Sequence, residues 1–394
     1  MTKGNVFKKI MSYILVAAIS SAATFGAIFY VGYQNRTKLD ELNSLIDTYY
    51  IGEPNKGAME EAAAYAMIEA MGDKWSYYIP ARDYTSYMEE MNNAYVGIGV
   101  TVSLTADKTG LEVKTVEEGG SAKEVGIRPG DVIIAVEGEL VADLGMSGAT
   151  VRIKGEENTA VTLTVRRGEE ELSFTPARRR VEVVVAAGQM LPENIGLVTI
   201  NNFDARCAQE TIAAIEALVE QGAEALIFDV RYNPGGYKRE LVKVLDYLLP
   251  EGVLFHSQDY TGAEAFDYSD ADCLELPMAV LINADSYSAA EFFAAALDEY
   301  DWAFTVGANT TGKGYFQSTF QMTDGSAVGL SVGKYFTPKG VSLAEVGGLQ
   351  VDLSVAVTEE MDALIYGGLL SPEEDPQIQA AVERLLEENA EKLD

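Results

Sequence analysis

The chain has 394 residues, of which 48% are hydrophobic, and its formal net charge at pH 7 is −32. This length and composition predict two or three domains with ordinary apolar cores. The acidic excess argues against nucleic acid as a partner, because no basic stripe is available to neutralise phosphates, and it disfavours docking to anionic lipid.

An uncharged, apolar stretch lies near the N-terminus, at residues 12–33, and it follows three lysines: Lys3, Lys8 and Lys9. About 20 apolar residues allow a helix to cross a bilayer. The lysines favour a cytoplasmic N-terminus, which places everything after Arg36 outside the cytoplasm. We therefore predict a single-pass anchor in the cell membrane over residues 1–36. The alternative is a signal peptide, cleaved near Ala22–Ala27, that releases a secreted protein.

The next two blocks of the chain differ in their hydrophobic pattern. Residues 37–94 carry apolar side chains at helical spacing, which predicts amphipathic helices. From Tyr95 the pattern changes to short alternating strands, with a turn at Gly130-Asp131 ahead of the strand Val132–Val136. We expect residues 95–180 to form a self-contained domain.

Residues 181–357 alternate apolar strands with helices, and we expect the helices at about 205–221, 238–249 and 289–300. Continuous apolar strands between helices predict a buried, mainly parallel sheet. The segment 318–340 is typical of a hairpin, and residues 358–394 form a charged helical tail in this prediction. The expected fold class is therefore α/β (α+β) and multidomain.

The stretch DSYSAAEFF, residues 285–293, lies where an apolar strand gives way to a helix. One interpretation is structural: Ser288 or Ser286 caps the helix, and Glu291 reaches back to close a capping box. The other interpretation is catalytic. A serine at the carboxyl end of a sheet strand, near the positive end of a helix, is well placed to react.

Two glycine-rich loops offer the remaining parts of an acyl-transfer site. Lys313 lies between Gly312 and Gly314, outside any complete phosphate-binding motif. Gly235 and Gly236 allow backbone N–H groups to converge on an oxyanion. Each loop also has a structural interpretation. Lys313 can be an exposed lysine in a turn, and Gly235 and Gly236 can form a turn whose backbone angles need glycine. Together with Ser288, the two loops fit a Ser–Lys acyl-transfer site, provided that burial lowers the pKa of Lys313 from the free value of about 10.4.

The other reactive side chains point to no cofactor. His256 is isolated, and we expect it to be packed or solvent-facing rather than catalytic. Cys207 and Cys273 lack metal-ligand spacing, so a zinc site is not expected. A disulfide between them and two free thiols both remain open. We expect neither a metal nor an organic cofactor.

At these residues the chain resembles the carboxyl-terminal processing proteases, peptidase family S41, which have a Ser–Lys dyad. The family's Ser-Ala-Ser-Ala-Ser-Glu box is similar to residues 286–291, and its Gly-Lys-Gly turn followed by glutamine to residues 311–317. Its Asp-Leu-Arg-x-Asn-Pro-Gly-Gly segment is similar to residues 229–236. The resemblance implies these roles: Ser288 as nucleophile, Lys313 as general base, Gln317 as its orienting partner, and an oxyanion hole from the N–H of Gly235 or Gly236 and that of Ala289.

The same resemblance identifies residues 95–180 as a PDZ domain inserted before a ClpP/crotonase-like catalytic core at residues 181–357. A PDZ domain adds an extended peptide to a sheet edge and captures its terminal carboxylate on backbone N–H groups. The implied peptide-binding residues are Val96, Gly97, Ile98, Gly99 and Val100. Holding a C-terminal tail there raises its effective concentration at the dyad.

The resemblance has departures, at Trp75, Asn158, Ala290 and a missing proline within residues 347–355, which indicate a divergent member. We predict a membrane-anchored, extracytoplasmic serine endopeptidase that binds the C-terminal tails of protein or peptide substrates, and we leave a homo-oligomer open. One rival is a catalytically inactive PDZ scaffold, against which the intact Ser288–Lys313–Gln317 set argues. The other is a crotonase-type thioester enzyme, which the PDZ resemblance and the outside location disfavour.

Overall fold

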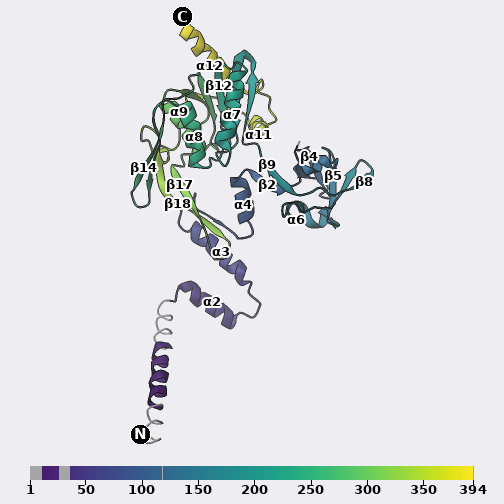
Figure 1. The fold of residues 1–394 in the computed structure, drawn as a ribbon, viewed down its shortest axis with the longest axis vertical. Helices are drawn as coiled ribbons and strands as arrows, with labels where there is room; N and C mark the ends of the chain where they lie inside the picture. The colour runs from purple at the N-terminus through teal and green to yellow at the C-terminus, as the bar shows by residue number, and fades with distance from the viewer. Residues whose placement is uncertain (1–10, 26–35, 118, 394) are drawn as a thin grey trace, which may run out of the picture. The chain divides into compact units, whose positions relative to one another are not determined.

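The computed structural model describes residues 11–25, 36–117 and 119–393. The chain divides into two compact units, Met1–Met71 and Gly72–Asp394. Figure 1 traces the helices and strands of both units.

The first unit is helical in its described part. Residues 11–25 form a helix, followed by α2 (Lys38–Tyr49) and α3 (Lys56–Glu69). Within the described ranges, none of the helices combines the length and the apolar character that a membrane crossing needs. Residues 26–33 of the predicted span lie outside the described residues.

The second unit is built on a six-stranded sheet with the order β10-β11-β12-β15-β16-β19. Its neighbouring strands are parallel except for the antiparallel pair β10–β11. The strands are β10 (Ala186–Leu191), β11 (Ile195–Ile200), β12 (Ala225–Asp229), β15 (Met278–Ile282), β16 (Ala303–Gly307) and β19 (Leu353–Ser354). The prediction of a mainly parallel sheet is therefore confirmed.

Alternate residues of the central strands face opposite sides of this sheet, as the pleat requires. In β12, Leu226 and Phe228 face one side, together with the apolar residues of three helices: α7 (Cys207–Glu220), α8 (Lys238–Leu248) and α9 (Ala289–Glu299). Ile227 faces the other side, where it joins Ile378 and Leu385 of α12 (Pro376–Leu393). The segment predicted as a charged tail thus supplies, after α11 (Glu359–Tyr366), a helix that completes the core.

A second, antiparallel sheet has the order β1-β18-β13-β14, with β17 also paired to β18. Its strands are β1 (Tyr77–Ile79), β13 (Gly252–Asp259), β14 (Glu264–Ser269), β17 (Tyr315–Gln321) and β18 (Ala327–Phe336). The predicted hairpin is confirmed by the β17–β18 pair. The prediction of helix throughout residues 37–94 is wrong at β1, because Tyr77 pairs with Gly329, a partner that local pattern cannot reveal. Helix α4 (Tyr84–Met91) follows β1.

The inserted domain has its own sheet and its own apolar core. The strand before it, β2 (Ala94–Gly97), pairs with the strand after it, β9 (Arg179–Glu182). Between them lie β3 (Val100–Leu104), β4 (Leu111–Val116), α5 (Ser121–Glu124), β5 (Val132–Val136), β6 (Glu139–Leu140), α6 (Val141–Ile153), β7 (Leu163–Arg167) and β8 (Glu170–Phe174). Strand β3 is at the edge of the sheet, open to pairing with another strand. Two short elements complete the second unit, η1 (Pro192–Asn194) and α10 (Leu343–Val346).

A buried cation ties the end of β12 to the start of α12. The guanidinium of Arg231 donates to both carboxylate oxygens of Asp229, at 2.9 and 2.6 Å, and to Gln377 at 2.8 Å. It also pairs with Asp375 at 2.8 Å, and the side chains of Arg231 and Asp375 are only 4% and 3% exposed. Removing the cation would leave two poorly solvated carboxylates without their partner.

We expect Arg231→Met to lower the free energy of unfolding by about 3–5 kcal/mol, because one partner of a buried ionic network is lost. Urea denaturation measures the change. The control is Arg180→Met, which removes an exposed pair with Glu182 at 4.0 Å and should cost less than about 1 kcal/mol. Equal losses in the two variants would contradict the importance given to burial.

Candidate active site

Ser288 lies where the segment after β15 turns into α9, with backbone angles φ 59° and ψ −122° that L residues rarely adopt. Ser286, two residues earlier, is fully buried and structural. Its hydroxyl donates to the carbonyl of Val230 at 2.7 Å and accepts from the N–H of Asn283 at 3.0 Å. Of the two candidate serines, only Ser288 lines the pocket described below.

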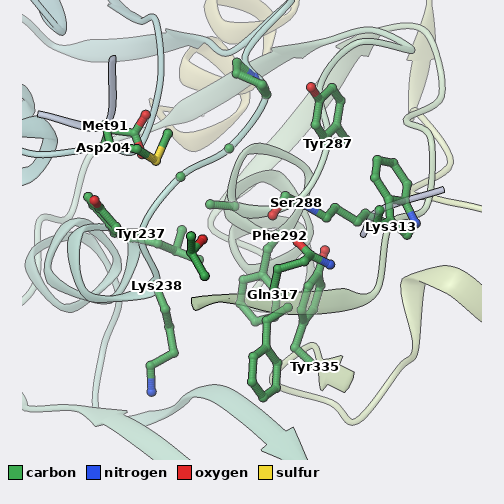
Figure 2. Close-up of a pocket in the computed structure, with 18 of the residues that line it drawn as sticks. Met91, Asp204, Tyr237, Lys238, Tyr287, Ser288, Phe292, Lys313, Gln317 and Tyr335 are labelled. Atoms are coloured by element: carbon green, nitrogen blue, oxygen red, sulfur yellow. The ribbon is translucent and has the colours of Figure 1, made fainter. Parts of the chain in front are cut away.

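The pocket has a volume of about 900 Å³, and its wall brings together residues far apart in the sequence. Ser288, Lys313 and Gln317 all line it. Figure 2 shows the side chain of Lys313 extending toward Ser288 from one side. Gly235, Gly236 and Ala289 line the same pocket. The structure thus gathers every residue to which the sequence assigned a role in the chemistry.

The buried carboxylate of Glu291 joins the serine to the lysine loop. It accepts the N–H groups of Ser288 at 3.1 Å, Gly312 at 2.8 Å and Lys313 at 2.6 Å. The hydroxyls of Thr310 and Tyr335 also donate to it, at 3.0 and 3.4 Å. Sequence reasoning found only the capping contact with Ser288, because a capping box gives no sign of a second set of donors 19 to 44 residues away.

Close packing explains why glycine precedes the lysine. A Cβ on Gly312, whose φ is +78°, would lie 2.5 Å from the backbone nitrogen of Gly348. Only glycine allows that approach and that backbone conformation together. The turn is therefore fixed on both sides, by Glu291 and by the chain near Gly348.

The amine of Lys313 lies in an aromatic setting, 5.0 Å from the ring centroid of Trp75 and 6.0 Å from that of Tyr287. Burial lowers the pKa of Lys313 to about 8, against the opposing effect of the negative charges of Glu291 and Asp73. A substantial fraction of the amine is therefore neutral near physiological pH, as a general base requires.

Tyr335 is a second contact that the sequence did not reveal. Its hydroxyl accepts the N–H of Gly314 at 3.0 Å, and it lies beside the Ser288 hydroxyl. Burial and the charge of Glu291 raise the pKa of Tyr335, and the contact with Ser288 offsets part of that rise. Tyr335 therefore stays a neutral donor.

Gln317 lines the pocket but uses its amide nitrogen elsewhere, donating to the Ser331 hydroxyl at 3.0 Å and to the Tyr315 carbonyl at 3.3 Å. Within the described part of the chain, no hydrogen bond joins Lys313 to Gln317 or to the Ser288 hydroxyl. Catalytic hydrogen bonds commonly tighten only when substrate is bound. The orienting role of Gln317 stays a prediction.

The two glycines predicted as oxyanion donors differ. The N–H of Gly235 donates to Asn233 Oδ1 at 2.8 Å, so it is occupied. Gly236 forms a parallel β-bridge with Phe203 in which the residues on either side of Gly236 make the hydrogen bonds. The carbonyl of Gly235 accepts the N–H of Phe203, and the N–H of Tyr237 donates to the carbonyl of Phe203. The N–H of Gly236 therefore faces away from Phe203, and it replaces Gly235 as the candidate donor beside Ala289.

Gly235 has a packing role instead. A Cβ there would lie 2.7 Å from both the Ala289 nitrogen and the Ser288 Cβ, and its φ is +93°. The absence of a side chain lets the glycine loop contact the start of α9 directly.

The five predicted peptide-binding residues do not line this pocket but lie at the start of the inserted domain. Ile98 is buried, and its carbonyl accepts the N–H of Ala122 at 3.0 Å.

The N–H of Val96 donates to Glu89 of α4 at 3.1 Å, and Lys154 of the inserted domain pairs with the same carboxylate at 2.9 Å. Tyr84, Tyr87, Met88 and Met91, from the same helix, line the pocket. Glu89 thus links the inserted domain to the pocket wall.

The remaining candidates lie elsewhere. His256 is packed against the rings of Phe266 and Phe336, with centroid distances of 4.2 and 4.9 Å, as expected of a packed histidine. Cys207 and Cys273 are free thiols, and burial raises the pKa of Cys207 to about 12. Among the described residues, no group of three or more His, Cys, Asp or Glu side chains is arranged to hold a metal ion.

Comparison with known proteins agrees with this arrangement. The model of peptidase family S41 matches residues 194–355, and the model of the PDZ domain matches residues 96–176. A CtpA-like serine protease of Staphylococcus aureus (strain MRSA252) is 29% identical over 310 residues, which cover 78% of this chain and 62% of that protein. The chain thus spans less than two thirds of the length of that relative.

Two further likenesses extend over most of the chain. A carboxyl-terminal-processing protease of Synechocystis sp. is 28% identical over 364 residues, covering 89% of this chain and 84% of that protein. A solved S41 protease structure from Bacteroides fragilis has a TM-score of 0.52 at 17% identity, covers 86% of this chain and 91% of the other, and shows a shared fold. Residues 194–355 are therefore similar to peptidase family S41, a family of serine-type peptidases, and the PDZ match covers the domain inserted between β2 and β9.

Proposed function

We propose that this protein is a serine endopeptidase that binds the C-terminal tails of its substrates through the PDZ domain and cleaves them by a Ser–Lys mechanism. The observation that carries the proposal is the position of the Lys313 amine, beside the rings of Trp75 and Tyr287 in the pocket that also holds Ser288. Burial lowers the pKa of Lys313 to about 8, and an acyl-transfer site requires an amine that gives up its proton this readily. The ClpP/crotonase-like character of the core is part of the same proposal.

In this mechanism the Ser288 oxygen attacks the carbonyl carbon of the scissile bond while Lys313 Nζ takes the hydroxyl proton. The N–H groups of Gly236 and Ala289 donate to the oxyanion of the tetrahedral intermediate. The carbon–nitrogen bond then breaks, and the lysine ammonium returns its proton to the leaving amine. A water molecule, deprotonated by the neutral lysine, hydrolyses the acyl-enzyme and frees Ser288.

We expect Ser288→Ala and Lys313→Ala each to lower kcat by about a thousandfold or more, because each removes one member of a single chemical unit. Ser286→Ala, which removes buried hydrogen bonds to Val230 and Asn283, should still cleave the peptides even if it unfolds more easily. Mass spectrometry of the products from tagged peptides measures cleavage. If the wild type yields no more cleaved product than Ser288→Ala, the result would instead support the inactive PDZ scaffold.

The pH profile follows from the lysine. Because the base must be neutral, kcat/KM should rise about tenfold per pH unit below pH 8 and level off above it. Asp73→Asn removes a negative charge that raises the pKa of Lys313, so the midpoint should move to lower pH. A profile that is flat between about pH 6 and pH 10 would contradict the role of Lys313 as base.

The PDZ domain should matter only for substrates with a free C-terminus. We expect a long peptide ending in a carboxylate to have a kcat/KM about tenfold above that of its C-terminal amide, because tethering raises its local concentration. Deleting residues 96–180 should abolish this difference. An undiminished preference in the deletion variant would reject tail binding by the PDZ domain.

The contacts of Glu89 with Val96 and Lys154 also support a gating role for the domain.

We also propose that residues 12–33 anchor the protein in the cell membrane, with the catalytic part outside the cytoplasm. The support is the sequence, an uncharged apolar stretch that follows three lysines. Carbonate-washed membranes should retain the full chain and release a form that begins after Arg36. Retention of both forms would contradict anchoring by this stretch.

A further inference from the structure

Asp204 is a buried acid that lines the same pocket as Ser288 and has no part in the mechanism above. It is 5% exposed, and its Oδ1 atom has no hydrogen-bond partner among the residues that the structure describes. Figure 2 shows Asp204 beside Met91, on the side of Ser288 away from Lys313. A buried acceptor without a donor is costly, so its presence in a pocket calls for an explanation.

The backbone holds Asp204 in a fixed place relative to the oxyanion donor. Its N–H donates to Asn202 Oδ1 at 3.0 Å, and the N–H of Ala205 donates to the Met91 carbonyl at 3.3 Å. A Cβ on Gly236 would lie 2.6 Å from the Asp204 nitrogen. Asp204 therefore lies directly beyond Gly236, in the wall of the pocket that holds Ser288.

The electrostatic setting favours a cation from outside the protein. Burial and the charge of Glu90 raise the pKa of Asp204 to about 7, against the opposing effect of Arg239. Arg239 does not satisfy Asp204, because its guanidinium stacks on the Tyr237 ring at 4.1 Å and pairs with Glu240 at 3.5 Å. This end of the pocket thus has an acid excess and no cation bonded to Oδ1.

The walls suit a long side chain with a charged tip. Figure 2 shows Met91 and Tyr237 on the Asp204 side of the pocket, and further rings and thioethers line the same pocket: Tyr84, Tyr87 and Met88. Such groups cover the methylene stem of lysine or arginine, and aromatic faces attract the cation. Oδ1 itself is almost inaccessible, and the neighbouring Met91 is an unbranched thioether, a side chain that adapts readily to a bound group.

We infer that Asp204 is a specificity-determining residue that binds a lysine or arginine side chain of the substrate, close to the scissile bond and on the side of Ser288 away from Lys313. This inference rests on the proposed peptidase function, because it concerns the substrate of the same pocket. Asp204 takes no part in bond breaking.

The test uses the full chain and peptides that are neutral except for one lysine, moved through each position around the cleavage site, each matched to a norleucine peptide. Norleucine keeps the stem of lysine and lacks its ammonium. At one position, the wild type should cleave the lysine peptide with a kcat/KM about tenfold higher, and Asp204→Asn should abolish that ratio. The control Glu224→Gln removes one exposed negative charge outside the pocket and should keep it.

A binding measurement separates this inference from the proposed function. Fluorescence anisotropy of labelled peptides on Ser288→Ala, with and without Asp204→Asn, reports the lysine preference without turnover. A preference that depends on Asp204 supports the subsite even if the wild type cleaves nothing, which would refute only the peptidase proposal. Cleavage of both peptides with equal kcat/KM, or a lysine preference that survives Asp204→Asn, overturns the subsite. The subsite is also overturned if Asp204→Asn raises Tm and leaves the lysine-to-norleucine ratio of kcat/KM unchanged. Asp204 would then destabilise the fold without selecting the substrate.

Discussion

The candidate site depends on one buried carboxylate, that of Glu291. Its side chain accepts backbone N–H groups from the start of α9 and from the turn that carries Lys313. Because Glu291 is fully buried, it is not shared with solvent, and its position sets the spacing between the two loops. Ser288 follows β15 and Lys313 follows β16, which are paired parallel strands, and Glu291 joins the two loops beyond the ends of those strands.

The charge of Glu291 and the burial of Lys313 have opposite effects on the pKa of the lysine. A negative charge near Lys313 favours the ammonium form, whereas a general base must be neutral. Burial outweighs the charges of Glu291 and Asp73, and the pKa of Lys313 falls. Spreading the charge of Glu291 over several donors weakens its pull on the amine. The site thus keeps a structural acid while the lysine releases its proton more readily than a free lysine, as the proposed mechanism requires.

The PDZ domain is inserted so that its two ends meet in the β2–β9 ribbon, just after α4. That helix contributes to the pocket wall and carries Glu89, which contacts both the ribbon and the inserted domain. A movement of the domain relative to this helix would therefore act on the wall that holds Met91, next to Asp204. Tail binding and side-chain selection, as proposed, would then share one structural element.

The sequence by itself determined the alternation of strands and helices and the β17–β18 hairpin, because these follow from hydrophobic period and turn signals, and its short motifs carry the family resemblance. It also pointed to Ser288, Lys313 and Gln317, which the fold brings to one pocket. Only the tertiary structure decided that β1 is a strand, that α12 completes the core, and that Gly235 is occupied while Gly236 is the candidate donor. Only it revealed the second role of Glu291 and the unpaired acid of Asp204. The physical reason is that each of these features depends on which donor, acceptor or apolar face a distant segment brings into contact, and local pattern carries no record of that partner.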